Sequence, residues 1–166
     1  YHISHLRKNI KLIDGYVFLT DYMKEWFDKD VSYTVLEGIY KAPEIQIEEP
    51  KQKEKAILYT GYLSEQYGIA ELVEAFLKVA EKDWKLELVG DGPMLSRLNR
   101  LAEENDSLVI KGLMPNNEVL KRQMQVSVLV NPRKGEQEFT KYSFPSKTIE
   151  YMASGTPMIG YRLSGI

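Results

Sequence analysis

The fold is decided by the stretch AILYTGYLSEQYGIAELVEAFLKVAEKDWKLELVG, residues 56–90. Its first six residues are apolar, aromatic or β-branched and end in Gly61, which is typical of a buried strand followed by a turn. From Ile69 onward, apolar residues recur every three or four positions, which predicts an amphipathic helix. KLELVG, at 85–90, repeats the strand pattern. The stretch therefore predicts a strand, a helix and a second strand in one right-handed crossover unit.

The same alternation continues to the end of the chain. Further strands are predicted at 108–112, 126–132 and 157–161, and further helices within 91–105, 114–124 and 145–155. Strands that alternate with helices of about ten residues form parallel sheets with both faces covered. The predicted fold class is therefore α/β, a Rossmann-like parallel sheet flanked by helices. Ligands of such folds bind where the loops gather at the carboxyl ends of the strands.

The composition narrows the class of protein. The chain has 166 residues, of which 43% are hydrophobic and 28% charged, enough for a packed core. Its net charge of −2 argues against non-specific nucleic-acid binding. The absence of cysteine excludes disulfides and thiolate metal sites and fits a reducing cytoplasm. No apolar run approaches the roughly 18 residues of a membrane-spanning helix, and no signal peptide is visible.

The first 55 residues lack the regular alternation of strands and helices that the rest of the chain shows. A short strand is predicted at 16–20 and a short buried strand within 33–40, ended by Gly38, and Asp21 is placed to cap the helix between them. A charged, proline-containing segment at 41–55 lacks a period and is interpreted as a linker. The chain begins without Met and ends directly after a strand-like run, so we expect a fragment of a longer protein.

The last predicted helix, PSKTIEYMASG, carries an unusual charge pattern. Its apolar side chains are expected in the core; they are Ile149, Met152 and Ala153. Ser146 and Glu150 share another face, because they are four residues apart. Lys147 lies in the first turn, where free N–H groups favour an anion rather than a cation. A bound phosphate would explain it, and a capped helix with a solvent-exposed Lys147–Glu150 pair is the alternative.

The loops before the helices contain further candidates. Gly61 directly follows a strand, where a glycine lets a ligand approach the backbone. The turn VGDGP, residues 89–93, contains Gly90 but lacks the third glycine of a dinucleotide fingerprint. The long segment 131–143 adds Arg133 and Lys141. These cations either neutralise a diphosphate or belong to a solvated loop of mixed charge.

Together, these motifs resemble the donor-binding domain of GT-B-fold retaining glycosyltransferases of family 4, the "glycosyl transferases group 1" type. The similarity covers 56–166 and rests on ILYTGYLSEQYGIAELVEAF, LELVGDGPMLSRL, LVIKGLMPNNEV and FPSKTIEYMASGTPMIG, in that order. The segment 1–40 resembles the tail of the amino-terminal acceptor domain. The predicted domains are therefore 1–40, a linker at 41–55, and 56–166 as a donor domain truncated at its carboxyl end.

The resemblance implies an enzyme with two facing Rossmann-like domains. A nucleoside-diphosphate sugar, a UDP-sugar in our interpretation, is the donor, and the acceptor is a saccharide or a lipid-linked saccharide. The glycosyl group is transferred with retention, without cofactor or obligatory metal, in polysaccharide or glycolipid synthesis. We expect a cytoplasmic protein that reaches the inner face of the cell membrane through the missing domain, and a fragment that is inactive alone.

The resemblance also assigns roles to residues. Glu150 matches the second glutamate of the family's E-x(7)-E motif, which binds the ribose. Ser146 and Lys147 are expected beside the diphosphate, and Gly112 and Leu113 near the nucleobase. The remaining residues expected to bind substrate are Gly61, Tyr62, Gly90, Lys141, Tyr142, Ser143 and Phe144. The residues expected to act in catalysis are Lys147, Arg133 and Glu138.

Three positions depart from the family pattern. Tyr142 stands where the first glutamate of the motif is expected, and Tyr62 and Tyr67 stand where many members have Arg and Lys. Our hypothesis is that Arg133, Lys141 and Lys147 replace the missing cations and that Glu138 replaces the carboxylate. Two alternatives stay open: a GT-B-type nucleotide-sugar epimerase, and a non-catalytic subunit that binds nucleotide sugars.

Overall fold

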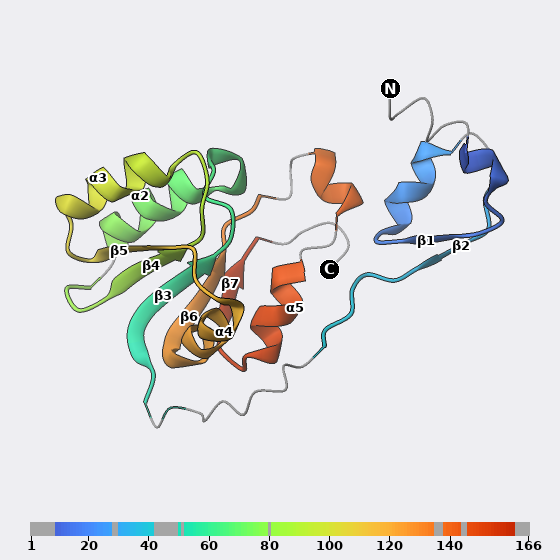
Figure 1. The fold of residues 1–166 in the computed structure, drawn as a ribbon. Coiled ribbons are helices and arrows are strands. Elements are labelled where there is room, and N and C mark those ends of the chain that lie inside the picture. The colour runs from blue at the N-terminus through green and yellow to red at the C-terminus, as the bar shows by residue number, and fades with distance from the viewer. Residues whose placement is uncertain are drawn as a thin grey trace. The chain divides into compact units, whose positions relative to one another are not determined.

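A computed structural model of the protein describes residues 9–27, 30–41, 50, 52–79, 81–134, 138–143 and 146–161. The chain divides into two compact units, drawn in Figure 1. Unit 1 contains Tyr1–Ile39, Glu136–Phe144 and Leu163–Ile166. Unit 2 contains Tyr40–Gly135 and Pro145–Arg162.

Unit 2 is built on a five-stranded parallel sheet with the order β5-β4-β3-β6-β7. Its strands are β3 (Glu54–Thr60), β4 (Lys85–Val89), β5 (Leu108–Gly112), β6 (Val126–Asn131) and β7 (Met158–Gly160). The chain runs outward from β3 to β5 and then returns to the other side of β3 for β6 and β7. The loops after β3 and β6 therefore diverge, and this is the point where ligands bind in open parallel sheets.

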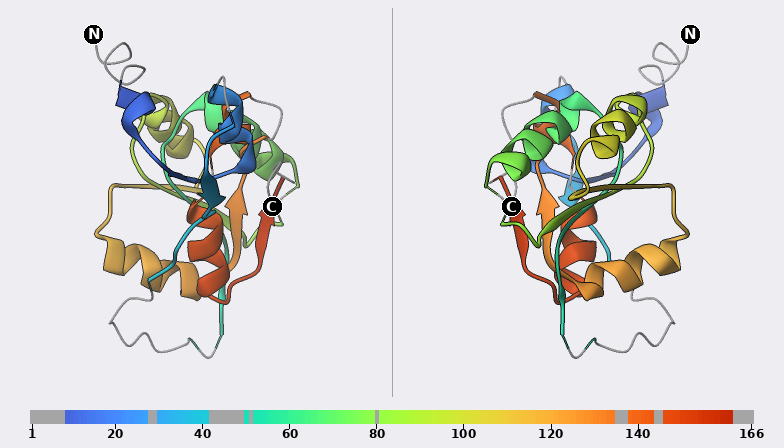
Figure 2. Two further views of the ribbon diagram at one scale, coloured as in Figure 1. Left: turned by 90° about the vertical axis from the view of Figure 1, so that its right-hand side faces the viewer. Right: turned by 90° about the vertical axis from the view of Figure 1, so that its left-hand side faces the viewer.

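Among the described residues, four α-helices cover the two faces of this sheet. Helices α2 (Ile69–Val79) and α3 (Leu95–Glu103) lie on one face, and α4 (Asn116–Gln125) and α5 (Ser146–Ala153) lie on the other (Figures 1 and 2). A short 3₁₀ helix, η3 (Glu65–Tyr67), precedes α2. The predicted parallel α/β fold is confirmed, and every strand and helix predicted within 56–161 is present.

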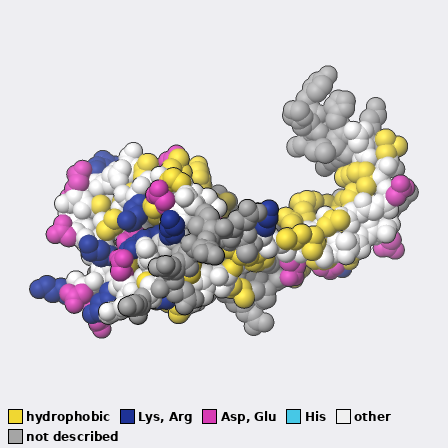
Figure 3. All heavy atoms as spheres, turned by 60° about the horizontal axis from the view of Figure 1, so that its bottom comes forward, with side chains coloured by type: hydrophobic (Ala, Val, Ile, Leu, Met, Phe, Trp, Pro, Cys, Tyr) yellow, Lys and Arg dark blue, Asp and Glu magenta, His cyan; other side chains and the backbone are white. Residues whose placement is uncertain are grey.

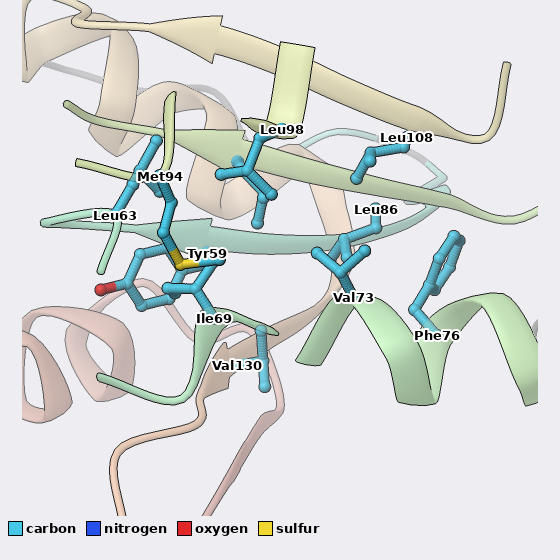
Figure 4. Packing of buried hydrophobic residues seen from close by; sticks show 11 residues of the cluster. Tyr59, Leu63, Ile69, Val73, Phe76, Leu86, Met94, Leu98, Leu108 and Val130 are labelled. Carbon is cyan, nitrogen blue, oxygen red and sulfur yellow. The ribbon is translucent and has the colours of Figure 1, made fainter. Parts of the chain in front are cut away.

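The first core lies under α2 and α3. Residues of α2 such as Val73 and Phe76 point toward the sheet, as Figure 4 shows. They pack on side chains of the strands, among them Tyr59 and the fully buried Leu86 and Leu88. Burying side chains of this kind stabilises a fold by about 1.5–3 kcal/mol each.

The second core lies under α4 and α5. It contains Leu58, Val126 and Leu129 from the strands and Tyr151 from α5, all fully buried. Since Leu58 and Tyr59 are consecutive, they point to opposite faces of β3 and join different cores. The strand is therefore buried on both sides, as its continuous apolar sequence predicts.

A charge cluster joins α4 to β3 and β4. Glu87 of β4 is 4% exposed. The Arg122 guanidinium of α4 donates to both Glu87 carboxylate oxygens, at 2.8 and 2.6 Å, and to both Glu54 oxygens, at 2.7 and 2.6 Å. Two bidentate pairs to one arginine fix the direction of α4 relative to β3 and β4.

Unit 1 contains a two-stranded parallel sheet of β1 (Tyr16–Phe18) and β2 (Tyr33–Val35). The described part of unit 1 also contains three 3₁₀ helices, η1 (Ile10–Leu12), η2 (Asp21–Trp26) and η4 (Glu138–Tyr142). The buried Phe18 packs against the rings of Tyr16, Phe27 and Tyr33, with centroids 5.0–5.7 Å apart. An aromatic cluster therefore holds the two strands together.

Three predictions for the first 55 residues are wrong in detail. The strand predicted at 33–40 ends at Val35, and its three residues are exposed rather than buried. Thr20 occupies the cap position of η2, whereas Asp21 is its first residue and accepts hydrogen bonds from Lys24 and Tyr33. The linker predicted at 41–55 overlaps the sheet, since β3 begins at Glu54; residues 42–49 and 51 lie outside the described part.

The surface of unit 2 carries charges of both signs. On the face shown in Figure 3, lysine and arginine side chains intermingle with aspartate and glutamate. In the described part of the chain, no helix has the length and apolar character that crossing a membrane requires.

Candidate functional site

A pocket of about 310 Å³ opens in unit 2 at the carboxyl ends of β3 and β4. Its lining residues are Thr60, Gly61, Tyr62, Val89, Gly90, Asp91, Leu113, Met114, Asn116, Val119, Lys147 and Glu150. Six of them were predicted from the sequence to bind substrate: Gly61, Tyr62, Gly90, Leu113, Lys147 and Glu150. The fold therefore brings together residues that are up to 89 positions apart.

Glycines shape the floor of the pocket. The Gly61 N–H donates to the Val89 carbonyl at 2.8 Å, and the Gly90 N–H donates to the Gly112 carbonyl at 2.8 Å. Both N–H groups are thus used within the protein, and neither points at a ligand. A Cβ on Gly90 would lie 1.8 Å from the Gly61 carbonyl oxygen, so only glycine fits there. Gly112 itself does not line the pocket.

Lys147 reaches across the end of β3. A Cβ on Gly61 would lie 3.0 Å from Lys147 Cε and 2.7 Å from the Tyr59 hydroxyl. Gly61 therefore makes room for the lysine stem, which places its ammonium at the pocket. No acidic group of the described residues forms an ion pair with Lys147, so its charge is available to an anion.

Glu150 lines the pocket one helical turn from the start of α5. One carboxylate oxygen, Oε1, accepts a hydrogen bond from Gln123 Nε2 of α4. The Lys147–Glu150 ion pair of the alternative interpretation is not observed among the described residues. Ser146, the first residue of α5, is exposed and does not line the pocket.

The face of α5 that packs on the sheet differs from the prediction. Thr148 and Tyr151 are buried, whereas the predicted core residue Met152 is 69% exposed. The Tyr151 hydroxyl accepts from the Thr60 N–H at 2.9 Å and lies 3.0 Å from Thr60 Oγ1. This contact anchors α5 to the last residue of β3, immediately before Gly61. Burial raises the pKa of Tyr151 to about 12.

Arg133 lies beside an aromatic pair. Its guanidinium carbon is 5.8 Å from the centre of the Tyr67 ring, and the Tyr67 ring meets that of Tyr62 edge-on at 6.3 Å. Desolvation lowers the pKa of Arg133 from its usual value. Tyr62 is 58% exposed and lines the pocket, whereas Arg133 does not.

The family model for glycosyl transferases group 1 matches residues 54–166, which include the pocket, α5 and all five strands of the sheet. The chain belongs to the glycosyl transferases group 1 family.

Two curated proteins are similar to this glycosyl transferases group 1 chain. The N-acetyl-alpha-D-glucosaminyl L-malate synthase of Bacillus anthracis is 30% identical over 119 residues, which cover 69% of this chain and 29% of that protein. An exopolysaccharide phosphotransferase of Streptomyces coelicolor is 26% identical over 157 residues, which cover 90% of this chain and 16% of that protein. The chain thus spans less than a third of each of these relatives.

Solved structures show the same architecture. The lipopolysaccharide outer core galactosyltransferase WaaB matches with a TM-score of 0.66 and 21% identity, covering 94% of this chain and 45% of that one. A variant of TarM from S. aureus, crystallised with UDP, matches with a TM-score of 0.70 and 17% identity, covering 94% and 31%. At these identities the likeness concerns the fold, which is that of the carboxyl-terminal domains of GT-B glycosyltransferases.

The other predicted site residues of this glycosyl transferases group 1 chain belong to unit 1. The Lys141 carbonyl accepts from Thr20 Oγ1 at 2.6 Å, and the Tyr142 hydroxyl donates to Glu25 at 2.9 Å. Tyr142 also packs on Trp26, with ring centroids 4.9 Å apart. Lys141 and Tyr142 belong to η4, and Ser143 follows it directly. The long loop predicted before α5 therefore contains a 3₁₀ helix. Glu138 begins η4, and Phe144 lies outside the described residues.

Two functional candidates escaped the prediction from sequence. Gln123 and Tyr151 are both fully buried and both act on α5. The sequence signal that could have revealed Gln123 is its place in the apolar stripe of α4, whose buried residues are Val119, Leu120 and Gln123. In the described part of the chain, no three His, Asp or Glu side chains gather into a group that could hold a metal ion.

Proposed function

We propose that unit 2 binds the donor of a retaining glycosyltransferase, a nucleoside-diphosphate sugar of the UDP class. The observation that carries the proposal is the meeting of Lys147 and Glu150 in one pocket at the carboxyl ends of β3 and β4. A cation and a carboxylate side by side suit a ligand with a phosphate group next to a ribose. Membership of the glycosyl transferases group 1 family supports this chemistry.

In this proposal, the diphosphate lies at Lys147 and the first turn of α5, where Ser146 begins the helix. The ammonium and the helix N–H groups stabilise the charge that develops on the leaving diphosphate. Glu150 accepts hydrogen bonds from the ribose hydroxyls, and the exposed Leu113 lies beside the nucleobase. Neither a metal nor another cofactor has a part in the proposed reaction.

Arg133 is the second cation assigned to the leaving group. The Tyr67 ring lies beneath its guanidinium, and Tyr67 in turn meets Tyr62 at the pocket wall. Aromatic support of an arginine side chain lowers the conformational freedom that it loses on binding an anion. The substrate roles of Lys141, Tyr142, Ser143, Phe144 and Glu138 rest on the family resemblance and stay predictions.

The remaining parts of the proposal concern the whole protein. Residues 1–40 are the tail of an acceptor domain, and the glycosyl group passes in the cleft between two domains to a saccharide or lipid-linked acceptor. The relatives named for exopolysaccharide and for N-acetylglucosaminyl malate synthesis support a role in polysaccharide or glycoconjugate synthesis. We assign the protein to the cytoplasm, at the inner face of the cell membrane.

The proposal is tested by UDP affinity in calorimetric titrations of the Lys147→Ala and Glu150→Ala variants. Each variant should bind UDP at least about tenfold more weakly, since each loses a charged hydrogen-bonding group. Lys121→Ala is the matched control, because Lys121 is exposed on α4 and does not line the pocket. Unchanged affinity in both pocket variants would refute the assignment.

A further inference from the structure

The inference concerns Gln123 of α4, which the proposed function does not use. Its side chain is 0% exposed, although glutamine is a polar residue with four hydrogen-bonding positions. Nε2 donates to Glu150 Oε1, whereas Oε1 of Gln123 is buried without a hydrogen-bond partner among the described residues. A buried carbonyl without a partner is unfavourable, so the amide is kept in the core for its N–H.

The main chain of the same residue holds the other end of α5. The Gln123 carbonyl accepts from Thr156 Oγ1 at 2.7 Å, and Thr156 is 4% exposed. The Thr156 N–H contacts Ser154 Oγ at 3.2 Å, directly after α5 ends. Gln123 therefore links α4 to α5 at Glu150 and again beyond its carboxyl end.

The direction of the Gln123 amide matches the charge of Glu150. A carboxylate accepts hydrogen bonds only, so the NH₂ group and not the carbonyl of Gln123 has to face it. This bond engages Glu150 Oε1 and leaves Oε2, with which no described residue forms a hydrogen bond. Since Glu150 lines the pocket, its second oxygen is the one available to a ligand.

We propose that Gln123 is a positioning residue that holds the Glu150 carboxylate in the orientation that binds the ribose hydroxyls of the donor. This inference rests on the proposed function. A carboxylate held by a rigid, buried donor loses less conformational freedom when it binds, and this raises affinity for the group it contacts. Gln123 itself does not touch the ligand, so it should affect the ribose contact and leave the diphosphate contacts unchanged.

The test compares ribose recognition in the native chain and in Gln123→Met, which keeps the length of the side chain and removes its donor. UDP, GDP and ADP are titrated first, and the nucleotide that binds is then compared with its 2′,3′-dideoxy form. The native chain should prefer the ribose form about tenfold or more. Gln123→Met should reduce this preference to about threefold or less by weakening the ribose form alone. Gln125→Met, at an exposed position of the same helix, should keep the native preference.

Three outcomes would overturn parts of the account separately. If the native chain binds none of the nucleotides, the proposed function fails, and this inference fails with it. If it binds both forms equally, the role of Glu150 fails. If the native chain prefers ribose and folded Gln123→Met keeps the preference, only the role of Gln123 fails.

A second measurement does not depend on the folding of Gln123→Met. In the native chain, the side-chain NH₂ signals of Gln123 in a ¹H–¹⁵N NMR spectrum should show a proton shifted downfield by the carboxylate. The signals should return toward ordinary values in Glu150→Gln, and they should move when the ribose nucleotide binds. Signals that are unaffected by both changes would overturn the inference.

Discussion

At the scale of single residues, the site depends on one buried hydroxyl group. Tyr151 is fully buried, and its hydroxyl hydrogen-bonds Thr60 at the end of β3, a residue that lines the pocket. Lys147 lies one turn before Tyr151 on α5, and Glu150 is its neighbour in sequence. The contact between Tyr151 and Thr60 therefore fixes the part of α5 that carries both of these pocket-lining side chains.

Tyr151→Phe should reveal this contact through the pH dependence of stability. Burial raises the pKa of Tyr151 from 10.0 to about 12, so the stabilising contribution is complete below pH 10 and is lost as the pH rises toward 12. The difference in the free energy of unfolding between native protein and Tyr151→Phe should therefore shrink by about 1 kcal/mol between pH 10 and pH 11. Urea unfolding at both pH values measures it.

The control for this experiment is Tyr161→Phe, since Tyr161 is 57% exposed. This variant should keep a constant difference from the native protein over the same pH range. A constant difference for Tyr151→Phe as well would show that its hydroxyl is not buried against Thr60.

At the scale of elements, the turns after β3 and β4 are packed so tightly that their glycines cannot be replaced. Gly90→Ala should destabilise the protein by more than about 3 kcal/mol or prevent folding, because the new Cβ would lie 1.8 Å from the Gly61 carbonyl oxygen. Gly112→Ala is the comparison, since a Cβ there meets no atom within 4 Å and only the φ of +64° opposes it. It should cost about 1 kcal/mol. Equal losses in urea unfolding would contradict the packing.

A second prediction at the scale of elements concerns the charge cluster that orients α4. Arg122→Met leaves the buried Glu87 without its bidentate partner, so it should destabilise the protein by about 2–4 kcal/mol at pH 7. Hydrogen bonds from Arg122 hold the pKa of Glu54 below its usual 4.5. The stabilisation that the Arg122–Glu54 pair contributes is present above pH 4.5 and is lost as the pH falls through the lowered pKa of Glu54.

The melting temperatures of native protein and Arg122→Met should therefore differ most near pH 7 and less at pH 3. Lys78→Met serves as the control, because Lys78 and Glu74 form an exposed pair on α2 with side chains 69% and 67% exposed. It should change the melting temperature far less than Arg122→Met does, because water screens an exposed pair. A similar effect of both substitutions would contradict a structural role for the buried cluster.

The elements of unit 2 were predictable from sequence, and parts of the site were not. Hydrophobic periodicity locates strands and helices because burial on both faces leaves continuous apolar strands and amphipathic helices. It failed on α5, where Met152 is exposed and Tyr151 is buried. Hydrophobic periodicity treats tyrosine and glutamine as surface residues. Tyr151 and Gln123 are nevertheless buried, because the side chain of each forms a hydrogen bond inside the protein.

At the scale of the whole molecule, the chain belongs to the glycosyl transferases group 1 family, and donor binding by unit 2 is our proposal. The chain spans 29% and 16% of its two curated relatives, so activity is a property proposed for the whole protein. Tyr142 packs on Trp26 in unit 1, which gives the residue at the expected glutamate position a structural role there. The separate binding of donor by unit 2 is the claim on which the rest depends.

The most direct test is calorimetric titration of the chain with UDP-, GDP- and ADP-sugars, each repeated on Lys147→Ala. We predict that a UDP-sugar binds in a one-to-one complex and that Lys147→Ala weakens it by about tenfold or more. Binding of none of the three, or equal binding to both proteins, would contradict the assignment of the pocket to a nucleoside-diphosphate sugar.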